Sequence, residues 1–286
     1  MTRLPGNLMR NNIGGIDHAV LAVRDLDVAR DTFERMGFVL TPRGQHTLGS
    51  QNHCVVFGRD YLELLWLPPD IKTRPFIGNF LERGEGLAAL ALKTRDAQVA
   101  HGELRAAGLE PTGVMDFSRP VHFAAGTHDA RFRTLDIGAR HAPCGRLFLC
   151  QHQTPELVWR PEWQRHDNGA TAIAAVAVVA ADVGATAAAY GKVFGVRAKK
   201  IAEGLLVETG GAPIAIATDR SLAKRLPGVW ISARPAPLMA VLFVRVADRD
   251  QAERRLSRGG FHSARMPDGS IAVGAAEAHG VAMVFG

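Results

Sequence analysis

The sequence has little cysteine and no long apolar run, and both shortages narrow the class of protein. Cys54, Cys144 and Cys150 stand far apart and form no CxxC pair, so neither a disulfide framework nor a structural zinc site is expected. The longest apolar run, from Ala170 to Ala181, is far shorter than the roughly 20 residues that a membrane-spanning helix needs. The opening stretch MTRLPGNLMRNN carries no apolar segment typical of a secretory signal. We therefore expect a globular protein of the cytoplasm.

Common motifs of nucleotide binding and serine catalysis are also missing, because the sequence holds no P-loop, no GxGxxG after a strand and no GxSxG. The 34 Lys and Arg residues exceed the 28 Asp and Glu residues and give a formal net charge of +6. This excess is spread along the chain, and no basic block is interleaved with aromatic residues. Such a pattern is typical of a solvated surface. We expect a small-molecule substrate and neither a nucleic-acid nor a membrane partner.

What the sequence does contain is a fourfold repeat. Each repeat has an apolar strand, an Asp, a helical stretch and a Gly followed by an apolar residue. The Asp can accept hydrogen bonds from the first N–H groups of the helix, and the Gly can adopt the left-handed conformation that ends it. The spacing from Asp to Gly is 12, 12, 13 and 12 residues, from Asp25 to Gly37, from Asp96 to Gly108, from Asp182 to Gly195 and from Asp248 to Gly260.

Short segments of β character follow each Gly, such as HCVVFG and DYLELLWL in the first repeat, so each repeat is predicted to be a βαβββ unit. Val28, Ala29, Phe33 and Met36 recur at roughly helical spacing in the first unit, as do Val99, Leu104 and Ala107 in the second, so each helix is expected to bury one apolar face. The sheet of one unit leaves one face open, so two units must pair. We predict the α+β class, with four βαβββ units in two paired cup-shaped sheets: residues 14–153, a linker at 154–169, and residues 170–286.

The order of the four units resembles the glyoxalase-like domain family of the vicinal oxygen chelate superfamily. The segments that carry the resemblance are GIDHAVLAVRDLDVARDTFERMGFVLTPRGQH, NHCVVFG, DYLELL and LVWRPEWQRHDNGA, and it is strongest over residues 14–170. The resemblance implies a divalent metal held inside a cup by His, Glu or Gln side chains from the first and last strands of paired units. The metal would take two adjacent oxygens of a substrate. Because the superfamily spans lyases, isomerases, dioxygenases, thiol transferases and metal-free drug-binding proteins, the resemblance does not select one reaction.

By this resemblance the metal ligands are expected at His18 on the first strand, at Glu63 in YLELL, and at His152 at the end of RLFLCQH. Two His and one carboxylate suit Fe(II), Mn(II), Ni(II) or Zn(II). Glu63 is also the candidate for catalysis. The second unit departs from the pattern, because Ala89 stands where His18 stands in the first unit and cannot bind metal.

Further residues are candidates for contact with a substrate, namely His53, Tyr61, Trp66 and Gln151. Gln151 could replace His152 as a ligand if the register of its strand were shifted by one. His166 in RHDNGA either matches a family motif or serves as a hydrogen-bonding residue of the linker.

The third and fourth units place Ala175 and Val241 at the position of His18, so the C-terminal pair is expected to be structural. For the whole chain we favour a metal-dependent enzyme of the lyase, isomerase or dioxygenase type that acts on a small oxygen-rich substrate. The alternative is a metal-free protein that binds or sequesters a small molecule, favoured by Ala89 and by aromatic residues that could wall a pocket. A third reading makes the cups assembly surfaces, and a homodimer is compatible with all three.

Overall fold

The computed structural model describes residues 10, 12–71, 75–123, 126–232 and 234–286, so most of the opening stretch lies outside the described residues. No helix in these ranges is long and apolar enough to cross a membrane. The N-terminal pair of units contains β1 (Ile16–Ala22), α1 (Leu26–Arg35), β2 (Gly44–Gln45), β3 (Gln51–Val56), β4 (Tyr61–Trp66), β5 (Gly86–Lys93), α3 (Ala97–Ala106), β6 (Met115–Phe123), β7 (Gly126–Asp136) and β8 (Arg146–His152).

The C-terminal pair repeats this order. It contains β9 (Ala170–Val179), α4 (Val183–Phe194), β10 (Lys199–Ile201), β11 (Gly204–Val207), β12 (Ile214–Ala217), β13 (Leu238–Val246), α6 (Arg249–Arg258), β14 (Ser263–Arg265), β15 (Ile271–Val273) and β16 (Ala282–Phe285). The α+β class with four βαβββ units is thereby confirmed. Two further helices, α2 (Pro75–Glu82) and α5 (Asp219–Arg225), lie in the connections between paired units and were not predicted.

The predicted helix ends are confirmed in all four units. The side chain of the Asp before each helix accepts a hydrogen bond from a backbone N–H of the first turn. The Gly after each helix has a φ of 92°, 70°, 73° and 81° in turn, the left-handed region that only glycine enters without strain. The expected helix faces are partly wrong, because Val28 and Val99 are 54% and 49% exposed.

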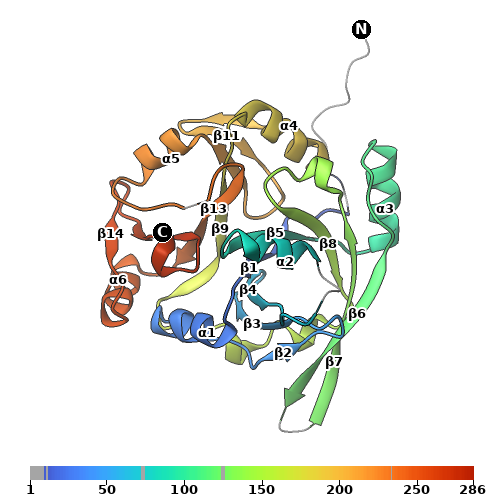
Figure 1. Ribbon diagram of the computed structural model, residues 1–286, viewed down its shortest axis with the longest axis horizontal. Helices are drawn as coiled ribbons and strands as arrows, with labels where there is room; N and C mark the ends of the chain where they lie inside the picture. The colour runs from blue at the N-terminus through green and yellow to red at the C-terminus, as the bar shows by residue number, and fades with distance from the viewer. Residues whose placement is uncertain (1–9, 11, 72–74, 124–125, 233) are drawn as a thin grey trace.

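Strand pairing shows which units combine. β1 and β5 pair antiparallel at the centre of the row β2-β3-β4-β1-β5-β8-β7-β6, which joins the first unit to the second. The third and fourth units join in the same way through β9 and β13. A short contact between β5 and β13 links both rows into one 16-stranded sheet. Figure 1 shows the N-terminal pair in blue to green beside the C-terminal pair in yellow to red.

The ends of the N-terminal row approach each other. The backbone N–H of Thr47, just after β2, donates to Ser118 O on β6 at 3.1 Å. Eight strands therefore curve around an interior, which we call the N-terminal cup. β6 and β7 form a long hairpin at one side of this cup (Figure 1).

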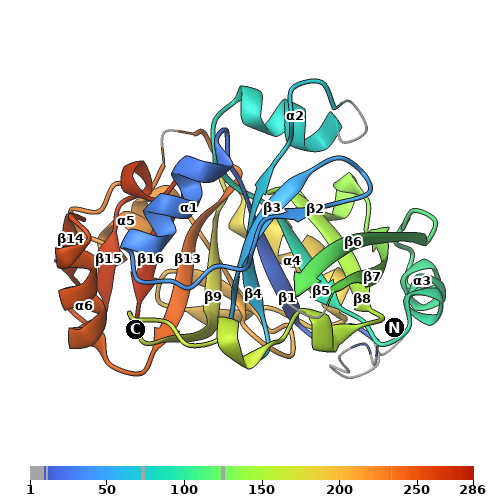
Figure 2. The same cartoon turned by 90° about the horizontal axis from the view of Figure 1, so that it is seen from below.

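Three clusters of buried apolar residues fill the molecule. One lies between the helices and the outer faces of both strand rows, and the other two fill the interiors of the two cups. Ile77 and Phe80 of α2 belong to the N-terminal interior, and Leu222 of α5 belongs to the C-terminal one. Each connecting helix thus covers the mouth of its own cup; Figure 2 shows α2 above the N-terminal strands.

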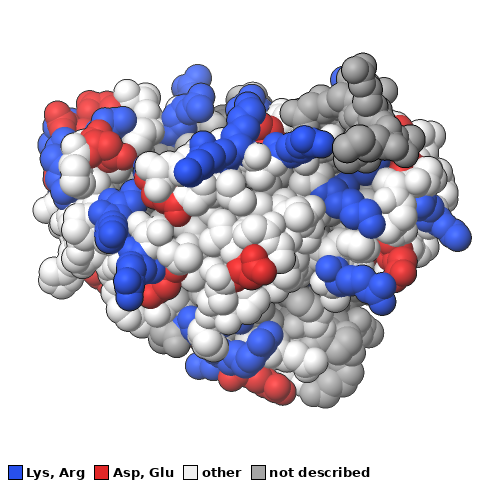
Figure 3. Space-filling view, turned by 90° about the horizontal axis from the view of Figure 1, so that it is seen from above, with Lys and Arg blue, Asp and Glu red and all other residues white. Residues whose placement is uncertain are grey.

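Charge on the surface is interspersed. Figure 3 shows one face on which Lys and Arg side chains are spread among Asp and Glu side chains. The scattered sequence distribution of basic residues is therefore kept on this face of the folded protein.

Candidate functional site

A polar pocket lies inside the N-terminal cup, and side chains from both ends of the strand row line it. Its polar lining includes His18, Asn52 and Glu63, and its free volume is about 40 Å³. The other lining residues are Val20, His46, Cys54, Tyr61, Leu65, Ile77, Ala89, Met115, Phe117, Arg119, Phe132, Thr134, Arg146, Phe148 and Cys150. A group of buried polar side chains surrounded by apolar walls is the usual composition of a small-molecule site.

A β-bulge at the start of β1 orients His18. Ile16 pairs with Leu92 and His18 pairs with Ala91, so Asp17 is an extra residue on this strand. Such a bulge lets two consecutive side chains approach each other instead of pointing to opposite faces. His18 Nδ1 lies 2.7 Å from Asp17 Oδ1. Because a carboxylate only accepts, Nδ1 carries the proton, and in the neutral ring Nε2 is left bare.

Glu63 lies at the centre of the polar lining and is 7% exposed. Its Oε2 is 3.8 Å from His18 Nε2, and its Oε1 is 3.6 Å from His46 Nε2. Asn52 Nδ2 donates to Glu63 Oε1 at 2.6 Å. Two imidazole nitrogens and a carboxylate therefore converge in a buried pocket.

Hydrogen bonds orient the His46 ring, as they do the His18 ring. Its Nδ1 lies 2.8 Å from Ser50 Oγ, and its Nε2 lies 3.4 Å from Asn52 Nδ2. Since the amide nitrogen of Asn52 only donates, Nε2 of His46 is the acceptor and Nδ1–H donates to the Ser50 hydroxyl. Both histidines thus turn an unprotonated Nε2 toward Glu63.

His152 lies on the other side of His18. Its Nε2 is 3.0 Å from Asp17 Oδ1, so one carboxylate oxygen contacts both rings. Burial alone would raise the pKa of Asp17, but the charge and hydrogen bond of His152, and those of His18, outweigh it and hold the pKa well below its ordinary value. The structure thus brings His18 to Glu63 on one side and, through Asp17, to His152 on the other.

A second grouping of potential ligands surrounds this carboxylate. One ligand atom each from Asp17, His18, Cys150 and His152 lies within 4.8 Å of the others, and this is the one such group of His, Cys, Asp or Glu in the described part of the chain. Glu63 is not in it. Burial raises the pKa of the Cys150 thiol well above its ordinary value, so in the absence of a cation this thiol stays protonated.

The second unit mirrors the first without its ligands. In the first unit His18 pairs with Tyr61, and Val20 pairs with Glu63. In the second unit Ala89 pairs with Arg146, and Ala91 pairs with Phe148. Taking Ala89 as the counterpart of His18, Phe148 stands where Glu63 stands. His152 lies four residues further along β8, at the end of the strand.

Tyr61, a predicted substrate contact, is at the site. Its ring stacks on the His18 ring with the centroids 4.3 Å apart and an interplanar angle of 18°. Burial raises the pKa of the Tyr61 hydroxyl well above its ordinary value, so the group stays neutral.

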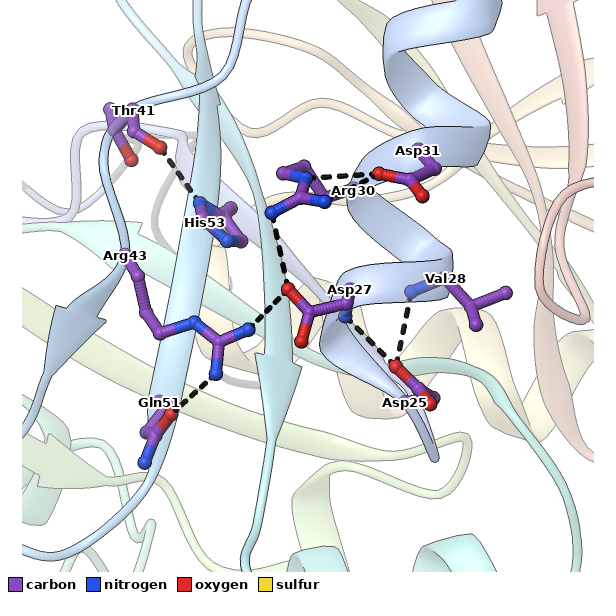
Figure 4. A network of polar contacts seen from close by, with 9 residues as sticks. All are labelled: Asp25, Asp27, Val28, Arg30, Asp31, Thr41, Arg43, Gln51 and His53. Atoms are coloured by element: carbon purple, nitrogen blue, oxygen red, sulfur yellow. Dashed lines mark hydrogen bonds and ion pairs between the residues drawn. The ribbon is translucent and has the colours of Figure 1, made fainter.

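His53 and Trp66 lie away from the pocket. His53 Nδ1 is 2.8 Å from Thr41 O, on the side of β3 that faces α1, where Figure 4 shows it near Arg43 and Asp27. Cys54, the next residue, lines the pocket, and alternation along a strand turns its neighbours outward. Trp66 packs against the outer core for the same reason, since its neighbour Leu65 lines the pocket.

Gln151 and His166 have structural contacts. Gln151 Oε1 accepts from the backbone N–H of Ala97 at 3.0 Å, at the first residue of α3. His166 Nδ1 accepts from Val39 N–H at 3.0 Å, and its Nε2 lies 3.1 Å from Val56 O. His166 thus connects the segment 154–169 to the first unit as a linker hydrogen-bonder.

Sequence reasoning missed His46, Asn52 and Arg119, which line the pocket, and Asp17, which contacts His18. Asn52 could have been found by alternation, because it is two residues before Cys54, which pairs with Glu63. His46 follows a strand of only two residues, so no periodicity marks it. Asp17 depends on the bulge, which the sequence does not reveal.

The C-terminal cup has a different interior. Its buried cluster consists of Ala, Val, Leu, Ile and Met side chains, among them Val241 at the position that corresponds to His18. Leu222 of α5 and Leu226, which directly follows this helix, pack into this cluster. The position of His18 thus offers no metal ligand in the C-terminal cup.

The paired βαβββ units, with their polar residues in one cup, define a protein of the vicinal oxygen chelate type. A family model described as a glyoxalase-like domain matches residues 16–194. The chain belongs to this glyoxalase-like domain family.

Comparison with solved structures supports the fold. A hypothetical protein from Staphylococcus aureus superposes with a TM-score of 0.68 at 14% identity, covering 95% of this chain and 98% of that one. A variant of 4-hydroxymandelate synthase from Streptomyces coelicolor gives 0.56 at 19% identity, covering 90% and 78%. A xylose isomerase-like TIM barrel/4-hydroxyphenylpyruvate dioxygenase fusion protein gives 0.55 at 15% identity, covering 98% and 50%. No curated protein sequence matches this chain.

Proposed function

We propose that this protein is a metal-dependent enzyme of the lyase, isomerase or dioxygenase type that acts on a small oxygen-rich molecule in the N-terminal cup. The observation that carries the proposal is the convergence of His18 Nε2 and His46 Nε2 on the two oxygens of Glu63, at 3.8 and 3.6 Å. These distances are too long for hydrogen bonds, and all of these atoms are electron-pair donors. Such a set is typical of a cation site.

The residue types present suit a divalent first-row metal, and a bound ion would have to draw them together, because one atom each from His18, His46 and Glu63 do not all lie within 4.8 Å of one another. Two imidazoles and one carboxylate match the two-His-one-carboxylate class, which leaves positions for substrate. Each histidine gives its other ring nitrogen to an outer oxygen, of Asp17 or of Ser50, as metal-binding histidines commonly do. When bound, the metal would act as a Lewis acid toward adjacent substrate oxygens and stabilise negative charge that forms on them.

The surrounding residues have roles that follow from their contacts. Asp17 and Ser50 fix the ring orientations of the two histidines, and Asn52 fixes one oxygen of Glu63 by its hydrogen bond. The apolar walls limit water and so strengthen electrostatic interactions inside the pocket. Aromatic walls are contributed by Phe117, Phe132 and Phe148.

This ligand set differs from the one expected from the sequence, because His46 replaces His152. In the structure His152 already contacts Asp17, which supports a role in orienting His18 through that carboxylate. The group of Asp17, His18, Cys150 and His152 is the rival position for a metal. His18 contacts Asp17 through Nδ1 and faces Glu63 through Nε2.

Elemental analysis tests the proposal. The wild-type protein, reconstituted separately with Fe(II), Mn(II), Ni(II) and Zn(II) and freed of loose metal, is expected to keep about one ion per chain of at least one metal and to unfold at a higher temperature. Glu63→Gln, which preserves an oxygen for Asn52, is expected to lose both effects. Retention of metal by Glu63→Gln would contradict the assignment to this pocket.

A metal-free binding protein is the second candidate function. It is favoured by Ala89 and Phe148, which stand where a second set of ligands would be. In that case none of the four metals would bind or stabilise the wild-type chain, and a small aromatic ligand would bind equally well with and without chelator.

The structural neighbours are compatible with an enzymatic function but do not identify a reaction. The names of two of them denote a synthase and a dioxygenase. At 19% and 15% identity they share the fold with this chain. The substrate class must therefore come from the residues of the pocket itself.

A further inference from the structure

Arg119 is a buried cation that lines the polar pocket. It lies on β6, is 4% exposed, and faces the interior together with Met115 and Phe117. Its guanidinium makes no ion pair and no hydrogen bond with any residue in the ranges that the structure describes. A guanidinium cannot lose its charge in a protein, and an unpaired buried charge is costly. The position therefore calls for an anion.

Asn52 Oδ1 lies beside this guanidinium. A Cβ placed on Gly44 would lie 3.1 Å from Arg119 Nη1 and 2.4 Å from Asn52 Oδ1, so both atoms border the same point. Asn52 Oδ1 is buried and has no hydrogen-bond partner. The bond from Asn52 Nδ2 to Glu63 fixes the amide, so Oδ1 must face this point. Because a Cβ would clash at this point, only glycine at position 44 lets Arg119 Nη1 and Asn52 Oδ1 lie side by side against its backbone.

We propose that Arg119 and Asn52 recognise a small organic carboxylate that carries a hydroxyl group on the neighbouring carbon. The carboxylate accepts the two parallel N–H bonds that the planar guanidinium offers. The hydroxyl donates to Asn52 Oδ1 and thereby satisfies that orphaned acceptor. This inference rests on the proposed function, because it names the substrate class of the same pocket.

The pairing suits the charge of the site. Glu63 is the acidic side chain among the pocket's lining residues, and its two oxygens lie 3.8 and 3.6 Å from Nε2 of His18 and of His46. A substrate carboxylate at Arg119 compensates the guanidinium without competing for those histidines. The hydroxyl then lies on the Asn52 side, next to the Glu63 carboxylate to which Asn52 donates.

The free volume limits the size of the substrate. The free volume of about 40 Å³ compares with the roughly 10–15 Å³ that a cavity needs to hold one water molecule, so the pocket holds only a few waters and a small hydroxy acid must displace a wall. The hairpin of β6 and β7, which carries Arg119, joins the rest of the cup through β8 and through Thr47. We expect this hairpin to shift outward when the ligand enters.

Calorimetric titration with three matched probes tests the proposal. Glycolate has both groups, acetate lacks the hydroxyl, and glycolamide lacks the charge. Glycolate is expected to bind wild-type protein roughly tenfold or more tightly than either of the others, and to slow hydrogen exchange in the β6–β7 hairpin. Equal binding of glycolate and glycolamide, or no binding of any probe, would overturn the proposal.

Variants identify the residue. Arg119→Gln is expected to lose glycolate binding, and Arg119→Lys, which keeps the charge but not the planar fork, is expected to bind roughly tenfold more weakly than wild type. Arg131→Gln, on the exposed face of β7, is the matched control and should bind glycolate normally. Normal binding by Arg119→Gln would contradict the assignment. If neither Arg119 variant folds, the wild-type probe series and the exchange pattern decide.

Failure of this inference is separable from failure of the proposed function. The titrations are made on chelator-treated protein and again on metal-loaded protein. Glycolate binding that depends on Arg119 in both forms supports the inference even if no metal is retained. Metal retention without any carboxylate binding overturns the inference and leaves the proposed function standing.

Discussion

Asp17 and His18 are adjacent in the chain, and the bulge in β1 brings Asp17 Oδ1 to 2.7 Å from His18 Nδ1. The same oxygen lies 3.0 Å from His152 Nε2. The bulge therefore fixes the tautomer of His18 and aims its bare nitrogen into the cup. The second unit contributes no ligand at the corresponding position. The contact with Asp17 nevertheless holds the His18 ring in one orientation.

Asp17→Asn is expected to weaken metal binding. The amide oxygen could still accept from both rings but carries no charge, so it would hold the two ring N–H groups more weakly and favour one tautomer of His18 less strongly. Loss of such an outer partner typically costs ~10- to 100-fold in metal affinity. Competition with a chelator measures it, and Asp116→Asn, at an exposed position on β6, is the control. An unchanged affinity in Asp17→Asn would remove the orienting role of Asp17.

Gln151→Ala is expected to change stability and leave ligand and metal binding unchanged. Gln151 Oε1 accepts from the backbone N–H of Ala97 at the start of α3. Loss of a capping acceptor costs ~1 kcal/mol, which denaturant unfolding can measure. A variant with wild-type stability and impaired metal or carboxylate binding would instead restore Gln151 as a substrate contact.

Asp60→Asn is expected to alter the pH dependence of stability. Burial raises the pKa of Asp60 from 3.8 to about 6, against the hydrogen bond from Ile173 and the charges of Lys93 and Arg59. Because the folded state holds the proton more tightly, this carboxyl makes the protein less stable as pH rises from about 4 to about 6. Above about pH 6 the whole loss in the free energy of unfolding is present. It amounts to about 3 kcal/mol, from 1.36 kcal/mol per pKa unit.

Asparagine at position 60 keeps an acceptor for Ile173 N–H, which bonds Asp60 Oδ1 at 2.8 Å, but has no charge to bury. The variant should therefore be more stable than wild type at pH 7 and equal to it at pH 4. Urea unfolding at both pH values measures the difference, with the exposed Asp129→Asn as control. A constant difference across the range would show that Asp60 does not titrate in this window.

The fold followed from local sequence signals. The Asp before each helix and the Gly after it act within a few residues, so their spacing predicted all four units. The helices α2 and α5 escaped because each is short and lies in a Pro- and Gly-containing connection. Their burial comes from tertiary packing over the cups, and no local periodicity in the sequence indicates this packing.

The site was only partly predictable. His18, Tyr61 and Glu63 stand on long strands whose inward face can be inferred, and the structure brings them together. Trp66 is three residues from Glu63, so strand alternation alone places it on the opposite face. The side chain of His46 reaches the pocket only because the ends of the strand row approach each other.

The most direct test of the central claim is Mn(II) titration of chelator-treated wild type, His46→Ala and His152→Ala by calorimetry. If the metal lies between His18, His46 and Glu63, wild type binds one ion, His46→Ala loses that binding, and His152→Ala keeps it with weakened affinity. If His46→Ala binds Mn(II) like wild type while His152→Ala does not, the metal lies beside Asp17 and the assignment to this pocket is wrong.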